Sequence, residues 1–188
     1  MKSNAGRKSR RVALIALNAA LYAVFILVTA YITTPFIIQF RSAVIVPAIF
    51  AALYGPLIGG FGAALGTFIA SIIRYGSPIL TIFSGTPGNF VCFYLLGYIA
   101  RKYSERDRWL LGYIIGSVVG LLAGFTIIAL GLYFLAAVVG MKTLLAWTNT
   151  SFITMALAFG IVSELPFMLI LGPPIIRALK RERLGSGP

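Results

Sequence analysis

Histidine is absent from this sequence, and cysteine occurs once, as Cys92. A lone cysteine excludes a disulfide bond within the chain, and the Ser–His and Cys–His pairs that activate nucleophiles cannot form without histidine. Zinc sites in proteins draw on several histidine or cysteine ligands, so we expect no metal site. No Walker A motif is present either, and the sequence alone predicts no ATP hydrolysis. We therefore expect a protein that is not an enzyme and has no resident cofactor.

Acidic residues are scarce too: four Asp and Glu stand against sixteen Lys and Arg, for a net charge of +12. Thirteen of the basic residues fall into three clusters, and the chain between them is almost uncharged. Loops that are rich in Lys and Arg stay in the cytoplasm, so the three clusters indicate how the chain is oriented in a membrane. Their expected contact is anionic lipid rather than nucleic acid. The clusters are Lys2, Arg7, Lys8, Arg10 and Arg11; Arg101, Lys102, Arg106 and Arg108; and Arg177, Lys180, Arg181 and Arg183.

Hydrophobic residues, by contrast, make up 60% of the chain, more than a soluble domain of this size can bury. Several apolar runs approach the ~20 residues that cross a bilayer. We predict an all-α, polytopic protein of the cell membrane with six transmembrane helices. The predicted spans are residues 12–33, 42–54, 57–73, 82–100, 109–139 and 151–176. The long fifth run predicts one tilted helix that either projects beyond the membrane or breaks near Gly140.

An even number of spans puts both termini on one side of the membrane, together with all three basic clusters. We therefore expect cytoplasmic N- and C-termini. The predicted organisation is a basic segment over residues 1–11, a single transmembrane domain over residues 12–181 and a flexible tail over residues 182–188. The other three cations, Arg41, Arg74 and Lys142, fall at outer loops.

Small residues recur four positions apart in three of the predicted spans. In hydrocarbon, close approach through small side chains is what allows helices to pack. The glycines of residues 57–73 and 109–139 favour packing within the bundle. The first span has two alanine rows on adjacent faces, which is more smooth surface than one neighbouring helix needs. We predict that Ala16, Ala20 and Ala23 form a docking face for a partner subunit. Asn18 could donate a hydrogen bond in either kind of interface, and its role stays open.

This first-helix AxxxA pattern resembles the docking motif of the substrate-binding S components of energy-coupling factor (ECF) vitamin transporters. Three further segments are similar to parts of those proteins: "FAALYGPLIGGFGAALGTFIAS", "GTPGNFVCFYLLGYIARK" and "LPFMLILGPPIIRALKR". The resemblance covers roughly residues 12–181. It implies a protein that binds a vitamin or vitamin precursor at the outer face. It also implies association with a transmembrane coupling subunit and two ATPase subunits, and reorientation as a body to release the substrate inward.

Polar residues within or next to the spans are the candidates for contact with such a substrate, because each one costs free energy in a membrane. Glu164 is the only acidic residue inside a predicted span, and it could contact a ligand, couple an ion or form an internal tie to an arginine. Arg41 and Arg74 could bind a carboxylate or phosphate, or they could extend to lipid headgroups.

Two further outer segments carry candidates. We expect the stretch "SGTPGN", residues 84–89, to be a loop, with Asn89 as a ligand contact or a helix cap. In the stretch "LAWTNTS", Trp147 could stack on a flat ring or lie in the aromatic belt of the membrane, and Asn149 is a further candidate contact. Tyr31, Phe36 and Tyr75 are additional aromatic candidates on the same side.

One alternative function remains at this point: an autonomous secondary carrier or channel that uses Glu164 as an ion or proton site. No large inverted repeat, the usual mark of such carriers, is visible in the sequence. An intramembrane enzyme finds little support without histidine, although chemistry based on Lys or Asp stays formally open. The substrate is not determined. The outer arginines favour an anion such as pantothenate or a folate-like acid, the aromatic residues favour a flat ring such as riboflavin or thiamine, and Glu164 favours an amine.

Overall fold

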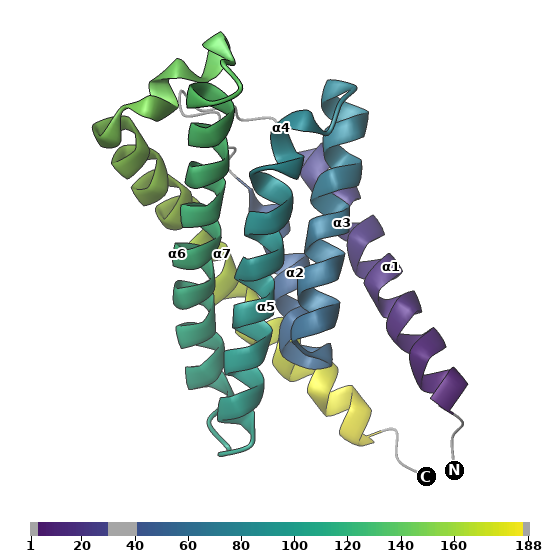
Figure 1. Ribbon diagram of the computed structural model, residues 1–188. Coiled ribbons are helices and arrows are strands. Elements are labelled where there is room, and N and C mark those ends of the chain that lie inside the picture. Colours follow the sequence, from purple (N-terminus) through teal and green to yellow (C-terminus); the bar gives the residue numbers. More distant parts are fainter. Residues whose placement is uncertain (1–3, 30–40, 186–188) are drawn as a thin grey trace.

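The computed structural model describes residues 4–29 and 41–185, and that part of the chain consists of helices and short connections without a strand. Figure 1 shows the helices running along one common axis as a bundle. Helix α5 (Gly85–Ser104) is the central element, because it packs most extensively against α6 (Trp109–Ala137) and α3 (Pro56–Tyr75). Helix α1 (Asn4–Thr29) lies at the edge, mainly against α3. The all-α prediction is confirmed.

Within the described residues, four helices are long and apolar enough to cross a membrane: α1, α3, α6 and α7 (Thr150–Gly185). Helix α5 has 20 residues but is not among them. Helix α2 (Ile45–Tyr54), with the short 3-10 helix η1 (Ser42–Val44) before it, is much shorter. At ~1.5 Å per residue, α2 spans about 15 Å, which is half of the ~30 Å hydrocarbon core. The count of six crossings stays a prediction.

Several predicted boundaries agree with the structure. Helices α2 and α3 are separated by Gly55 alone, which has a positive φ of 99° and is followed by Pro56 at the first position of α3. Helix α6 is continuous and ends at Ala137, and Gly140 beyond it has a φ of 77°, so the break near Gly140 is confirmed. A 3-10 helix, η2 (Lys142–Thr148), then leads into α7.

Two predicted boundaries differ from the structure. The loop over residues 84–89 is wrong: α5 begins at Gly85, and the short helix α4 (Ile79–Ile82) makes the turn instead. Pro87 does not prevent this helix start, because the first turn of a helix needs no backbone N–H donor. Helix α7 continues through its three internal prolines to Gly185, well into the segment predicted as a flexible tail. Proline is tolerated in such helices because neighbouring groups satisfy the freed carbonyls.

The glycine rows lie inside the bundle, as predicted. A Cβ at Gly116 of α6 would lie 2.9 Å from the Leu96 carbonyl oxygen of α5, and one at Gly120 would lie 2.5 Å from the Cys92 carbonyl oxygen. Only glycine permits this close approach of the two backbones. On α3, Gly62 faces the side chain of Asn18, and Gly66 faces Tyr22 of α1.

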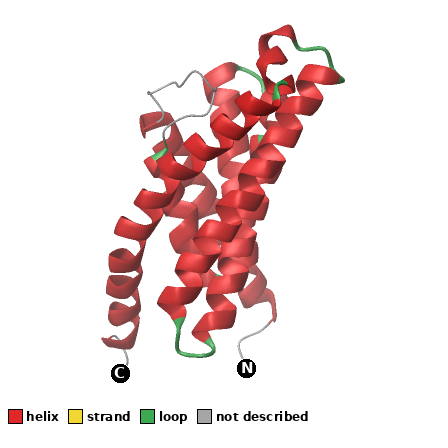
Figure 2. Ribbon diagram, turned by 90° about the vertical axis from the view of Figure 1, so that its left-hand side faces the viewer, coloured by secondary structure: helices red, strands yellow, loops and turns green. Residues whose placement is uncertain are grey.

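The first turn of α1 and the last turn of α7 lie at one end of the bundle, together with the turn between α5 and α6 (Figures 1 and 2). The described residues of the three basic clusters therefore gather at this end, as the topology prediction requires. We call it the basic end. The last turn of α3, helix α4 and η2 lie at the other end, which we call the far end (Figure 1).

Candidate ligand-binding site

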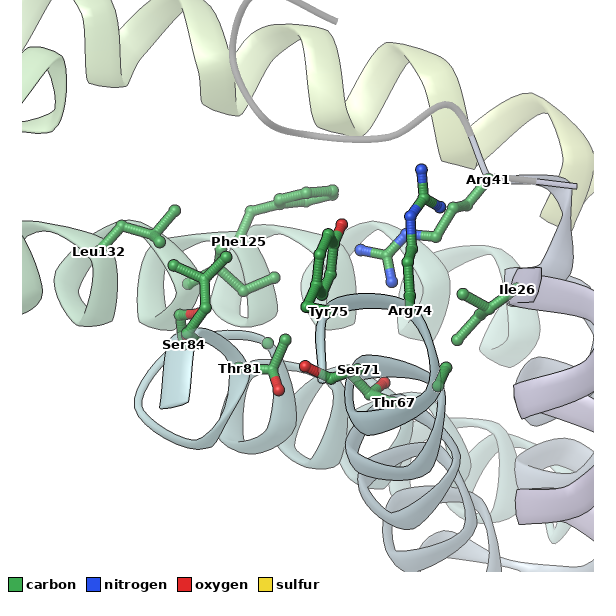
Figure 3. A pocket seen from close by; sticks show the side chains of 14 residues that line it. Ile26, Arg41, Thr67, Ser71, Arg74, Tyr75, Thr81, Ser84, Phe125 and Leu132 are labelled. Carbon is green, nitrogen blue, oxygen red and sulfur yellow. The ribbon is translucent and has the colours of Figure 1, made fainter. Parts of the chain in front are cut away.

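A cavity lies at the far end, and its empty space, counted together with the part that is open to solvent, is about 700 Å³. Figure 3 shows Thr67, Ser71, Arg74 and Thr81 of α3 and α4 on one side of it and Phe125 and Leu132 of α6 on the other. The residues that line it are Ile26, Arg41, Thr67, Ala70, Ser71, Arg74, Tyr75, Leu80, Thr81, Ser84, Gly85, Phe125, Ile128 and Leu132.

Arg41 and Glu164 form an ion pair beside this cavity. The Arg41 Nε lies 3.6 Å from the Glu164 Oε1, and the two side chains are only 13% and 5% exposed. Arg41 reaches this depth because it directly precedes η1 and the short α2, which begins well below the top of α3 (Figure 1). Arg41, expected at an outer loop, is therefore largely buried, and its charge is paired with that of Glu164. Removal of one member of such a pair would leave a buried charge uncompensated.

A second, smaller cavity adjoins the first, since Arg41, Phe125 and Ile128 line both. Asn89, Cys92 and Glu164 line only the second one. Of the predicted substrate contacts, the structure therefore brings Arg41, Arg74, Asn89 and Glu164 together around two adjoining cavities.

Asn89 is neither a loop residue nor a helix cap. It is 5% exposed and lies one turn into α5. Its Nδ2 donates hydrogen bonds to the Thr67 Oγ1 (3.0 Å) and the Gly85 carbonyl oxygen (2.8 Å), and its Oδ1 accepts one from the Tyr22 hydroxyl (3.3 Å). One side chain thus joins α1, α3 and α5 next to the cavities.

Arg74 lies in the last turn of α3 and lines the larger cavity. Its guanidinium carbon is 5.5 Å from the centre of the Tyr75 ring, within the range of a cation–π interaction. Figure 3 shows Arg41, Arg74 and Tyr75 near one another, at some distance from Leu132. The two guanidinium groups therefore lie toward the same end of the cavity.

Trp147 and Asn149 are not among the described residues that line these cavities. Trp147 is 1% exposed and packs edge-on against Phe152 at a centroid distance of 5.4 Å, so in the structure it is a core residue rather than part of an aromatic belt. Asn149 is exposed, and its Oδ1 accepts a hydrogen bond from the Phe152 N–H over 3.2 Å. This is the geometry of a cap at the start of α7. Tyr31 and Phe36 lie outside the described residues.

The predicted docking alanines divide between two faces of α1. Ala16 and Ala20 are exposed, in line with Leu17, Leu21 and Val24 on the outer face. Ala23 is only 4% exposed and belongs to the hydrophobic core. It therefore packs inside the protein's own bundle, and the smooth outer face contains Ala16 and Ala20 without it.

Several cavity residues were not singled out from the sequence, among them Thr67, Ser71 and Thr81. A signal for two of them was present: Thr67, Ser71 and Arg74 follow one another at spacings of four and three, which places them on one face of α3. No comparable pattern marks Phe125 or Leu132, because the apolar run of α6 is uniform.

The arrangement offers charge, hydroxyl groups and apolar surface to a small molecule. It offers no obvious metal site, since the described residues contain no group of three or more His, Cys, Asp or Glu side chains. These side chains can bind a small molecule through charge, hydrogen bonds and apolar contact.

Comparison with known proteins agrees with a binding role. Residues 10–176 match the family model described as "ECF transporter, substrate-specific component". An 85-residue stretch is 35% identical to a Pyrococcus woesei protein described as "Uncharacterized protein in gap 3'region". That stretch covers 44% of this chain, and the match spans about half (53%) of the relative's length. No solved structure matches the chain. The family match extends over most of the sequence, and this membrane-embedded chain therefore belongs to the family of substrate-specific components of ECF transporters.

Proposed function

We propose that this protein is the substrate-capture subunit of an ECF-type ABC importer. It binds a water-soluble vitamin or vitamin precursor at the outer face of the cell membrane. It then delivers the substrate inward together with a transmembrane coupling subunit and two ATPase subunits. The observation that carries this proposal is the position of the larger cavity, which lies at the end of the bundle opposite the basic clusters.

The orientation follows from charge. Loops rich in Lys and Arg stay in the cytoplasm, so the basic end faces inward with both termini. The far end and its cavity then face outward, where a scarce nutrient is captured. Because the sequence lacks a Walker A motif, the energy for release comes from other subunits.

Docking of the coupling subunit involves the outer face of α1. Ala16 and Ala20 leave a smooth strip on this face, and small residues permit the close helix approach on which association in lipid depends. The cavities lie on the inner side of α1, where Ile26 contributes to the wall.

Reconstitution tests the proposal. The chain is co-expressed with a coupling subunit and two ATPase subunits of an ECF system, purified through a tag on this chain, and placed in vesicles. We expect the four subunits to purify together and to take up a vitamin only when ATP is supplied. Gradient-driven uptake by this chain alone, without the other subunits, would instead establish the secondary-carrier alternative in which Glu164 serves as the ion site.

A further inference from the structure

The far end of the bundle holds more positive than negative charge. The whole chain has four acidic side chains, and Glu105, Asp107 and Glu182 belong to segments at the basic end. Residues 30–40, outside the described part, contain no Asp or Glu. Glu164 is thus the one side-chain carboxylate near the cavities, where two guanidinium groups, those of Arg41 and Arg74, line the larger cavity.

The charge of Arg41 is compensated by Glu164, but its guanidinium group is not fully hydrogen-bonded. The distance of 3.6 Å from its Nε to the Glu164 Oε1 is longer than a hydrogen bond. Among the described residues the buried Nε has no hydrogen-bond partner. A guanidinium has five N–H donors, and buried donors without acceptors are rare and call for an explanation. An oxygen-rich anion in the cavities would supply acceptors.

Three hydroxyl groups that line the cavity, on α3, on α4 and at the start of α5, indicate which hydrogen-bonding groups a ligand could carry. Ser71, Thr81 and Ser84 each donate their hydroxyl hydrogen to a backbone carbonyl oxygen, at 3.2, 3.2 and 2.5 Å. Their oxygens retain lone pairs, because each hydroxyl has two acceptor sites. These oxygens therefore accept hydrogen bonds from a ligand that carries N–H or O–H groups.

Phe125, Ile128 and Leu132 of α6 form an apolar wall of the cavity, in addition to Ile26 and Leu80. Figure 3 shows Leu132 away from the two arginines. A ligand that extends along the cavity can therefore contact the guanidinium groups and the apolar wall of α6 at the same time.

We propose that the substrate is a small organic carboxylate. Its carboxylate binds between Arg41 and Arg74, its N–H or O–H groups face the oxygens of Ser71, Thr81 and Ser84, and its apolar part packs on Phe125 and Leu132. This proposal rests on the proposed function and makes it specific: vitamins that are cations or neutral rings are excluded as high-affinity substrates.

The test uses matched pairs of an acid and its neutral counterpart on the purified full-length protein. Suitable pairs are pantothenate with pantothenol, nicotinate with nicotinamide, and biotin with biotin amide, with thiamine and riboflavin as cationic and neutral comparisons. Binding is measured by calorimetry, and material retained through purification is identified by mass spectrometry. We expect one acid to bind, or to be retained, and its neutral counterpart to bind at least about 30-fold more weakly, as expected for the loss of a buried charge-assisted contact.

Single substitutions then test which arginines bind the carboxylate. Arg74→Gln and Arg41→Gln should each weaken binding of the acid about 30-fold or more and remove the preference over the neutral counterpart. Lys142→Gln is the matched control: it removes the third cation of the far end, which is exposed and does not line either cavity. It should leave binding unchanged. A preference that survives in Arg74→Gln, when that variant retains the thermal stability of the wild type, overturns the proposed arrangement.

Other outcomes separate this proposal from the proposed function. Tight binding of thiamine, of riboflavin or of a neutral counterpart overturns the carboxylate proposal but leaves the role as an importer subunit intact. The carboxylate proposal is also overturned if no acid of the panel binds and no carboxylate is found in the material retained through purification. Failure to assemble with any coupling subunit overturns the proposed function, whatever the protein binds.

Discussion

Asn18 on α1 donates a hydrogen bond to the carbonyl oxygen of Ile58 on α3, with the Nδ2 and the oxygen 3.0 Å apart. The same amide lies where a Cβ at Gly62 would be. A polar side chain that is completely buried in an apolar helix needs such a partner, because hydrocarbon offers none. Asn18 therefore holds α1 against the bundle, which gives this residue the role that its sequence left open.

Loss of this contact should lower stability. An interhelical hydrogen bond in a membrane protein contributes about 0.6 kcal/mol and at most about 1.7 kcal/mol, so Asn18→Leu should lower the unfolding temperature modestly. Gly62→Ala should lower it more, because the added Cβ meets Asn18. Leu17→Ala, at a residue 50% exposed, is the control and should have little effect. A thiol-reactive dye can follow unfolding, since the only thiol, Cys92, is buried. Unchanged unfolding of both variants would contradict the contact.

The Arg41–Glu164 pair should show coupling in a double-mutant cycle. Arg41→Gln leaves the Glu164 carboxylate buried without its cation, and the loss of one partner of a buried pair costs about 3 to 5 kcal/mol. The double variant Arg41→Gln/Glu164→Gln should regain most of that stability, because no charge remains. Thermal unfolding of the four proteins measures the coupling. Additive effects of the two substitutions would show that the groups do not interact.

Substitution by tryptophan should have different effects on the two faces of α1. Ala20→Trp should leave the stability of the isolated protein nearly unchanged, because Ala20 is exposed, and should prevent purification with the coupling subunit. Ala23→Trp should lower stability itself, since Ala23 is buried in the core. Val162→Trp on α7, at a residue 71% exposed, serves as the control for added surface bulk. A normal complex with Ala20→Trp would mean that the coupling subunit docks elsewhere.

Single cysteines should report the orientation. After Cys92→Ala, cysteines placed at Gly6 and Ser104 should be protected from an impermeant thiol reagent in intact cells and should react once the membrane is permeabilised. A cysteine at Thr143 in η2, an exposed position of the far end, should react in intact cells. Labelling of Gly6→Cys in intact cells, with Thr143→Cys protected, would reverse the orientation.

The sequence predicts the helices well because their signals are local. Apolar runs mark α1, α3, α6 and α7, and Gly55 followed by Pro56 marks the turn between α2 and α3. The start of α5 was missed because Gly, Thr and Pro together resemble a loop, whereas the preceding turn at α4 and the packing against α6 allow a helix from Gly85.

The site was predicted only in part, for a different reason. Charge alone marks Arg41, Arg74 and Glu164, but nothing local says that Arg41 lies deep enough to reach Glu164. That depth depends on the short length of α2 and on how α2 contacts α7. For Trp147 the prediction was wrong in the opposite sense, because the residue is more buried than expected. Its position near an outer loop favours a ligand contact or the membrane interface, and only tertiary packing shows that Phe152 and the core surround it.

In the proposed function, helix α1 serves ligand binding and subunit docking from different sides of one helix axis. The exposed Ala16 and Ala20 face outward, whereas the buried Tyr22 and Ile26 face the bundle next to the cavities. Substitutions on the inner side would then change which molecule is bound while the outer strip keeps its shape, and the reverse would also apply. Ligand specificity and subunit docking would therefore be free to change independently.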